Sequence, residues 1–140
     1  MKIAVICANG KAGKLIAREA VERGLDVTAV VREENRSAAQ HVLKKDLFDL
    51  TAADLKGFDA VIDAFGAWTE ETLPQHSASL AHLCGILSGS ETRLLVVGGA
   101  GSLYVNPEHT ACVADGPDFP PQFLPLARAQ GKALAELRER

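Results

Sequence analysis

The sequence predicts an α/β domain built on a doubly wound parallel sheet, with helices on both faces of the sheet. Short apolar runs recur along the chain, segments with helical periodicity separate them, and the runs do not alternate apolar with polar residues. Apolar runs without alternation indicate strands that are buried on both faces, as in a parallel sheet. The length of 140 residues suits one domain, so we expect residues 1–140 to form a single domain.

The expected elements alternate in regular order. Strands are predicted at residues 2–8, 27–31, 41–46, 60–65 and 93–97. Helices are predicted at 14–23, 72–87 and 122–139, with a short helix at 36–40, a capped turn at 51–55 and a loop at 101–121. One side of the helix at 72–87 carries Leu73, His76, Leu80, Leu83 and Leu87. Right-handed crossovers then predict about five strands in the order 3-2-1-4-5.

Sheets of this order usually continue into a sixth strand, and the sequence shows none after the last helix. We therefore expect either a C-terminally truncated chain or a naturally short one. The last helix carries several leucines and could bury its apolar face against a second subunit, which would make a homodimer.

Composition and charge exclude several classes of protein. The net charge of −3 argues against a nucleic-acid binder, which usually has a strongly basic face. No apolar run reaches the roughly 18–20 residues of a membrane-spanning helix, so we expect no membrane association. Cys7, Cys84 and Cys112 are too few and too widely spaced for a disulfide framework, which favours the reducing cytoplasm. The four histidines are scattered without metal-ligand spacing, so we expect no metal site.

The segment CANGKAG at residues 7–13 joins the first expected strand to the first helix. Glycine at position 10 lets a backbone approach a pyrophosphate, and glycine at position 13 lets helix and strand pack closely. The N–H groups at the helix start then face the anion. We predict a Rossmann-like fold whose dinucleotide contacts come from Cys7, Asn9, Gly10, Lys11, Ala12 and Gly13. Cys7 replaces the first glycine of the usual motif, and the alternative is a turn whose small residues serve packing alone.

Arg32 follows the second expected strand, at the position that faces the adenosine ribose in such folds. NAD-specific sites have an acidic residue there, whereas a guanidinium favours the 2′-phosphate of NADP through charge-assisted hydrogen bonds. Arg32 therefore predicts NADP(H) in preference to NAD(H). Glu33 and Glu34 are alternative neighbours of the ribose, and Arg32 could also be a solvated charge.

Ligands of open α/β sheets bind at the carboxyl ends of the strands, and two further strand ends carry candidates. After the third strand we expect cofactor contacts, with the adenine edge, from Asp46 and Leu47, although Asp46 could instead cap a turn. After the fourth strand we expect contacts beneath the ribose and pyrophosphate from Ala64, Phe65 and Gly66. Phe65 and Trp68 could also form the wall of a pocket.

The fifth strand ends in the sequence GGAGSLY at residues 98–104. Its glycines leave room for a flat ring, so Gly98 is expected beside the nicotinamide. Ser102 and Tyr104 carry the hydroxyls placed to meet the nicotinamide or a substrate carbonyl, and they are our candidate catalytic residues. The alternative for Ser102 is a turn hydroxyl that bonds its own backbone.

Four segments together resemble a known group: KIAVICANGKAGKLIAREAVERGLDVTAVVR, KKDLFDLT, LKGFDAVIDAFGAW and LLVVGGAGSLYV. They are similar to atypical short-chain dehydrogenase/reductase proteins, and more narrowly to the bacterial NADH-flavin reductase group, which is related to NmrA-like and biliverdin reductase B-like proteins. The resemblance covers essentially the whole chain. It implies NAD(P)H binding and hydride transfer to a flavin (FMN or FAD) or another small acceptor. The family motif falls on Gly10, Gly13, Arg32, Asp46, Gly66 and Ser102.

One departure from the resemblance concerns the Y-x-x-x-K pair of short-chain dehydrogenases. Lys132 stands at a plausible place to hold the cofactor ribose, but Arg128 occupies the position of the tyrosine that would donate a proton. Its absence argues against carbonyl–alcohol chemistry. Flavin or quinone reduction needs mainly stacking against the nicotinamide, because the cofactors carry that chemistry. A non-catalytic NAD(P)-sensing protein of the NmrA-like kind is the alternative, and a sugar-nucleotide epimerase is a third reading.

Overall fold

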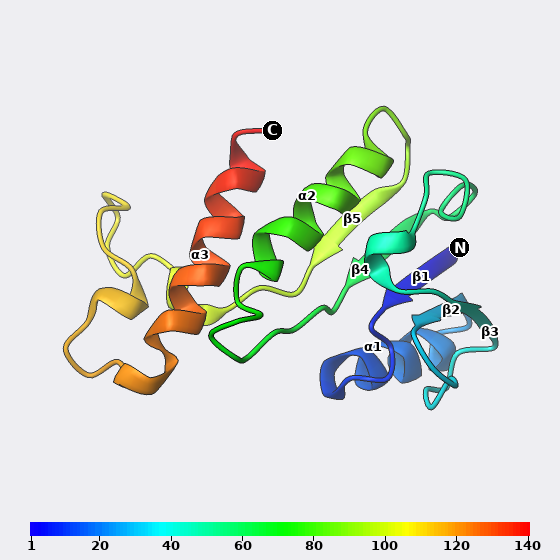
Figure 1. Cartoon of the computed structure of the whole chain (residues 1–140), viewed down its shortest axis with the longest axis horizontal. Helices are drawn as coiled ribbons and strands as arrows, with labels where there is room; N and C mark the ends of the chain where they lie inside the picture. Colours follow the sequence, from blue (N-terminus) through cyan, green and yellow to red (C-terminus); the bar gives the residue numbers. More distant parts are fainter. The chain divides into compact units, whose positions relative to one another are not determined.

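The structure is a computed structural model that describes residues 1–140. Its five strands are β1 (Lys2–Ile6), β2 (Asp26–Val31), β3 (His41–Lys44), β4 (Ala60–Asp63) and β5 (Arg93–Val96). All neighbours pair in parallel, in the order β3-β2-β1-β4-β5 (Figure 1). The doubly wound α/β prediction and its strand order are therefore confirmed.

The chain forms three α-helices: α1 (Lys11–Glu22), α2 (Gln75–Leu87) and α3 (Leu124–Arg138). The chain divides into two compact units, one of residues 1–65 and 82–97 and one of residues 66–81 and 98–140. The first unit holds the whole sheet and α1, and the second holds α3 and the segment before it. A single domain over 1–140 stays a prediction. No helix combines the length and the apolar character needed to span a bilayer.

The sheet order defines where a ligand would bind. The chain leaves β1 toward β2 and β3 on one side, and then returns to place β4 and β5 on the other side of β1. In open α/β sheets the crevice at such a reversal receives the ligand, at the carboxyl ends of the strands. The segments that begin at Cys7 and Ala64, directly after β1 and β4, therefore flank the expected binding crevice.

The first unit is held by two apolar clusters that flank the sheet, because successive side chains of a strand point to opposite faces. One cluster contains Ala4, Ile6, Val30, Leu47, Leu50, Leu55, Phe58, Val61 and Leu83. The other contains Ile3, Val5, Ala8, Ala17, Ala20, Val27, Ala29 and Val31. In β1, Ile3 and Val5 thus pack opposite to Ala4 and Ile6. Burial on both faces explains why these strands lack apolar–polar alternation.

One predicted element is wrong: residues 36–40 form no helix. Their short polar side chains bond the local backbone instead, which competes with helix formation. Asn35 Oδ1 accepts from the Ser37 N–H at 2.9 Å, and Ser37 Oγ accepts from the Ala39 N–H at 3.3 Å.

The segment predicted as a loop at 101–121 contains local order. The Val105 N–H donates to the Ala111 carbonyl at 3.0 Å, and the Val113 N–H donates to the Leu103 carbonyl at 2.9 Å. These bonds make residues 103–113 a small antiparallel hairpin.

Candidate nucleotide site

Cys7 begins the glycine-rich turn and adopts the backbone conformation that the usual glycine would take. Its φ is 60°, which lies in the left-handed region. The Cys7 N–H donates to the Val30 carbonyl at 3.0 Å, and the Cys7 carbonyl accepts from the Gly10 N–H at 3.0 Å. A non-glycine residue in this conformation costs roughly 1–2 kcal/mol. The replacement of glycine by cysteine therefore keeps the geometry of the turn at the cost of some strain.

Gly13 is required for the turn to pack against α1. A Cβ at this position would collide with the Cys7 carbonyl oxygen and would lie 2.8 Å from the Ala8 Cα. A Cβ at Gly10 would meet only the Cys7 carbonyl oxygen, at 3.3 Å. The two glycines thus have different roles. Gly13 allows the turn to pack closely against α1, whereas Gly10 leaves the outer surface of the turn without a side chain.

The N-terminus of α1 has the features of an anion site. The helix starts at Lys11 with no side-chain cap and no acidic residue in its first turn. Helix geometry leaves the N–H groups of that turn, including those of Lys11 and Ala12, without intrahelical acceptors. These N–H groups and the helix dipole favour a negative charge, so the turn fits the pyrophosphate of a dinucleotide.

Asn9 holds two loops together. Its Nδ2 donates to the Glu34 carbonyl at 2.7 Å, and its Oδ1 accepts from the Arg36 N–H at 2.6 Å. The side chain predicted to touch the cofactor is therefore bonded to the loop that follows β2. Asn9 fixes the position of that loop relative to the glycine-rich turn.

Arg32 directly follows β2 and is exposed. Its acidic neighbour Glu33 pairs with Arg36 instead, at 3.3 Å between Oε2 and Nη2. The Arg32 guanidinium thus remains available to a phosphate group. Its charge acts on Cys7, whose pKa it lowers against larger opposing effects.

At the end of β3, Asp46 has the capping role that the sequence offered as an alternative. Asp46 Oδ1 accepts from the Phe48 N–H at 2.9 Å, so Asp46 caps the short 3-10 helix that follows. The Leu47 side chain is buried in the core cluster beside Leu50. A contact between this segment and adenine would therefore involve Asp46 or the backbone of Leu47.

The end of β4 carries a buried carboxylate. Asp63 is 4% exposed, and its Oδ1 accepts from the Phe65 N–H at 3.0 Å. The Ala64 N–H donates to the Ile6 carbonyl at 3.2 Å, and Phe65 packs against the core. Burial and then the negative charge of Asp63 raise the pKa of the Cys7 thiol to about 11. The thiol beneath the turn is therefore protonated at neutral pH.

In the second unit, the glycines after β5 serve two purposes. A Cβ at Gly99 would collide with the Gln130 side chain of α3, and a Cβ at Gly101 would lie 2.8 Å from the Ala127 Cβ. Gly98 has no atom near the position of a Cβ. Gly99 and Gly101 thus allow α3 to approach, and Gly98 alone borders open space.

The two candidate catalytic hydroxyls have separate partners. Ser102 Oγ donates to the Gly99 carbonyl at 3.1 Å, which is the turn role left open by the sequence. The Tyr104 hydroxyl accepts from Arg138 Nη1 at 3.1 Å, and its ring stacks on His109 with centroids 4.2 Å apart. The structure has no hydrogen bond between these two hydroxyls.

Lys132 is exposed on α3, and its Nζ lies 3.8 Å from Glu136 Oε1. Both Lys132 and Glu136 belong to the same helix face one turn apart. The interaction is a weak surface pair, which leaves the lysine able to turn toward a ligand.

Two polar residues that were not among the predicted site residues take part in this architecture. Gln130 packs on Gly99, as described above. His76 is buried in α2, and its Nε2 donates to the Ala67 carbonyl at 2.9 Å. The signal in the sequence was a histidine within the apolar side of a helix, a position that requires a buried hydrogen-bond partner.

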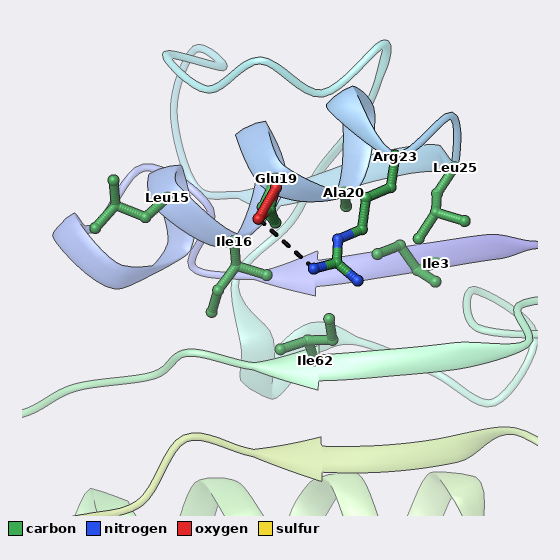
Figure 2. Close-up of a pocket in the computed structure, with 8 residues that line it drawn as sticks. All are labelled: Ile3, Leu15, Ile16, Glu19, Ala20, Arg23, Leu25 and Ile62. Carbon is green, nitrogen blue, oxygen red and sulfur yellow. Dashed lines mark ion pairs between the residues drawn. The ribbon is translucent and has the colours of Figure 1, made fainter.

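The first unit also has a shallow apolar groove of about 350 Å³ beside α1 (Figure 2). It runs beside α1 over Ile3 of β1 and Ile62 of β4, and Leu15 and Ile16 form part of its wall. Its polar contribution is the exposed pair of Glu19 and Arg23, 3.7 Å apart. This groove offers no convergent polar groups for chemistry. No group of three or more His, Cys, Asp or Glu side chains could hold a metal ion.

Comparison with known proteins agrees with this geometry. The sequence profile of the NAD(P)H-binding family matches residues 7–139. The uncharacterized protein YwnB of Bacillus subtilis (strain 168) is 46% identical over 141 residues, which cover 99% of this chain and 66% of YwnB.

Two solved structures extend the comparison. The crystal structure of SP1627 from Streptococcus pneumoniae TIGR4, whose name as an NADH-flavin reductase is provisional, matches with 58% identity and a TM-score of 0.96 over 99% of this chain and 66% of SP1627. The Lmo0794 protein of Listeria monocytogenes matches with 38% identity and a TM-score of 0.73 over 99% of this chain and 72% of Lmo0794. The chain thus spans 66% of the length of both YwnB and SP1627.

Proposed function

Because this chain belongs to the NAD(P)H-binding family, we propose that it binds NADPH in preference to NADH and reduces a flavin or a similar planar acceptor. The observation that carries the proposal is the turn between β1 and α1. Its glycine at position 13 cannot accept a side chain, and its helix N-terminus has no cap. Bound NADPH would supply a hydride, and the acceptor would take up that hydride together with a proton from water.

The preference for NADPH rests on Arg32. The guanidinium follows β2, is exposed and has no ion pair, while the nearby Glu33 is already paired with Arg36. An unpaired guanidinium beside the ribose favours a 2′-phosphate.

The proposal of a planar acceptor is based on a residue pair that the last helix does not contain. Arg128 and Lys132 do not form the tyrosine–lysine pair that donates a proton to a carbonyl substrate. Hydride transfer to a flavin requires no such donor on the protein, since the reduced flavin can take its proton from solvent. Anaerobic mixing of the protein with NADPH and FMN tests this proposal. We expect loss of the nicotinamide absorbance at a rate above that of the reagents alone, and no such loss with flavins, quinones or biliverdin would contradict a reductase.

A specific observation favours the second candidate, a non-catalytic NAD(P) sensor of the NmrA-like kind. The Ser102 hydroxyl already donates its proton to the Gly99 carbonyl, so it does not stand ready as an acid. Calorimetry separates the two functions: a sensor would bind the dinucleotide with no turnover of any acceptor.

We further propose a cytoplasmic location, since all three cysteines are free thiols. We also propose that the site binds a small-molecule substrate. A homodimer through α3 stays a prediction, which light scattering during size-exclusion chromatography tests.

A further inference from the structure

The segment that follows β3 begins with a lysine that is paired to an aspartate further along the chain. Lys45 Nζ donates to Asp54 Oδ2 at 2.7 Å, and the two side chains are only 36% and 19% exposed. The pKa of the Asp54 carboxyl lies below its ordinary value, because Lys45 and the Thr51 N–H donate hydrogen bonds to it. Asp54 is therefore ionised at neutral pH, and a hydrogen bond between two charged groups is stronger than a neutral one.

Asp54 also closes the short turn that begins at Thr51. Its Oδ2 accepts from the Thr51 N–H at 2.9 Å, and the Asp54 N–H donates to Thr51 Oγ1 at 3.3 Å. The two residues thus form the reciprocal arrangement of a capping box. One carboxylate oxygen thereby joins the start of this turn to the lysine that follows β3.

The stretch between Lys45 and this turn contains the residue expected beside adenine. The Lys45 N–H donates to the Val31 carbonyl at 2.9 Å, which holds the start of the stretch against the end of β2. Asp46 accepts from the Phe48 N–H through its side chain and from the Asp49 N–H through its carbonyl, at 2.9 and 3.0 Å. Asp46 is therefore held by hydrogen bonds on both of its sides.

The other end of the stretch is fixed in the core. Leu50 and Leu55 are buried in the same apolar cluster, and the Leu50 carbonyl accepts from His82 Nε2 at 2.8 Å. The ion pair of Lys45 and Asp54 then connects the two ends of residues 45–54. All of these partners belong to the first compact unit, so the arrangement is a property of that unit alone.

We propose that Lys45 and Asp54 are positioning residues for the adenosine half of the nucleotide. They act without touching the ligand, by holding Asp46 and the Leu47 backbone where the adenine edge is expected. Contacts that are held in place before binding lose less conformational freedom when the ligand arrives, so the ion pair raises the affinity. This inference rests on the proposed nucleotide-binding function and names the pair that shapes one end of its site.

The test uses two fragments of the nucleotide as probes. The compound 2′,5′-ADP reports on the adenosine half, and inorganic pyrophosphate reports on the turn at residues 7–13. Both are titrated into the full chain by calorimetry, for the wild type and for Lys45→Met and Asp54→Asn, which each remove the ion pair. We expect each variant to bind 2′,5′-ADP roughly fivefold more weakly and to bind pyrophosphate as the wild type does.

The direction of the Asp54→Asn effect separates positioning from simple electrostatics. Because 2′,5′-ADP is an anion, loss of a negative charge by itself should strengthen its binding, whereas loss of the Lys45 charge should weaken it. A positioning role requires weaker binding in both variants. It also requires that the double variant binds no more weakly than either single variant, since the same ion pair is lost only once. Tighter binding by Asp54→Asn would overturn the proposal.

Three further variants serve as controls. Lys45→Arg keeps a charged donor, and we expect it to retain most of the affinity. Lys44→Met removes the neighbouring positive charge, which is exposed on β3, and should keep 2′,5′-ADP binding within about twofold of the wild type. Asp59→Asn removes a carboxylate that accepts from the Lys2 N–H at 2.7 Å before β4, and should leave this binding unchanged. Equal losses in Lys44→Met and Lys45→Met would contradict a role of the ion pair.

The outcomes distinguish the inference from the proposed function. Urea unfolding confirms that each variant is folded, and if Asp54→Asn does not fold, Lys45→Met and Lys45→Arg still test the proposal. Unchanged binding of 2′,5′-ADP by Lys45→Met would overturn the positioning role and leave the nucleotide site intact. No binding of 2′,5′-ADP or NADPH by the wild type would contradict the proposed function itself, and this inference with it.

Discussion

The backbone N–H of Arg36 donates to Oδ1 of Asn9 over 2.6 Å, which ties the loop after β2 to the turn after β1. A second bond, from Asn9 Nδ2 to the Glu34 carbonyl, completes the link. The segment expected to hold the ribose phosphate is thereby fixed to the segment expected to hold the pyrophosphate.

Replacing Asn9 with alanine should therefore weaken NADPH binding, because it releases the loop after β2 from the turn after β1. Two hydrogen bonds disappear, and we expect about 1–3 kcal/mol of lost affinity, measured by calorimetry. Asn35→Ala is the control, since Asn35 bonds only within its own loop. An unchanged affinity in Asn9→Ala would show that the link has no part in binding.

Arg32→Ala tests the nucleotide preference. Loss of a charge-assisted bond to the 2′-phosphate should cost about 1.5–3 kcal/mol with NADPH and little with NADH. The dissociation constants of both nucleotides are compared by calorimetry, with Arg36→Ala as a control because Arg36 is paired with Glu33. Equal effects of Arg32→Ala on the two nucleotides would refute the assignment.

Alanine at position 13 and alanine at position 10 should have different consequences. Gly13→Ala places a methyl group against the backbone of Cys7 and Ala8, so we expect a destabilisation of more than about 1–3 kcal/mol in urea unfolding. Gly10→Ala should fold with nearly normal stability and bind NADPH more weakly, because the methyl group covers the approach to the turn. Normal stability of Gly13→Ala would contradict the close packing described here.

Cys7 should give the protein a distinct response to alkaline pH. Burial, then the charge of Asp63, raises its pKa from the usual 9.0 to about 11, so the folded state favours the protonated thiol. As the pH rises, the Cys7 thiol ionises in the unfolded chain before it ionises in the folded chain. The contribution of Cys7 to the free energy of unfolding should therefore be fully present below pH 9, and it should fall by about 2–3 kcal/mol as the pH rises to about 11.

The measurement is urea unfolding at several values between pH 8 and pH 11, for the wild type and for Cys7→Ala. The difference between the two curves isolates the thiol from other groups that titrate in this range. A constant difference across the range would contradict the raised pKa of Cys7.

The sequence was sufficient for the sheet because the strands are short apolar runs with a turn or loop after each, and β1 and β2 are buried on both faces. The sequence also located the turn at residues 7–13, because the close packing at position 13 permits only glycine and so leaves a recognisable motif. The failure at residues 36–40 has a local cause, since Asn35 and Ser37 offer the backbone partners that a periodicity argument ignores.

The side-chain partners were beyond the reach of the sequence. Asn9 has two bonding groups that could serve a ligand or a neighbouring loop, and only the folded chain places Glu34 and Arg36 beside it. The glycines after β5 suggested room for a flat ring, whereas Gln130 and Ala127 of α3, which are distant in the sequence, occupy the space beside Gly99 and Gly101. Long-range contacts of this kind leave no trace in local spacing.

These helix contacts have an evolutionary consequence. A Cβ at Gly101 would lie 2.8 Å from the Ala127 Cβ, so a larger residue at position 101 requires a smaller residue at position 127 or a shift of the helix, whereas the flexible Gln130 side chain beside Gly99 can move aside. Across related chains, positions 101 and 127 should therefore change together. Selection on the loop after β5 would then be recorded in the face of α3 that packs on that loop.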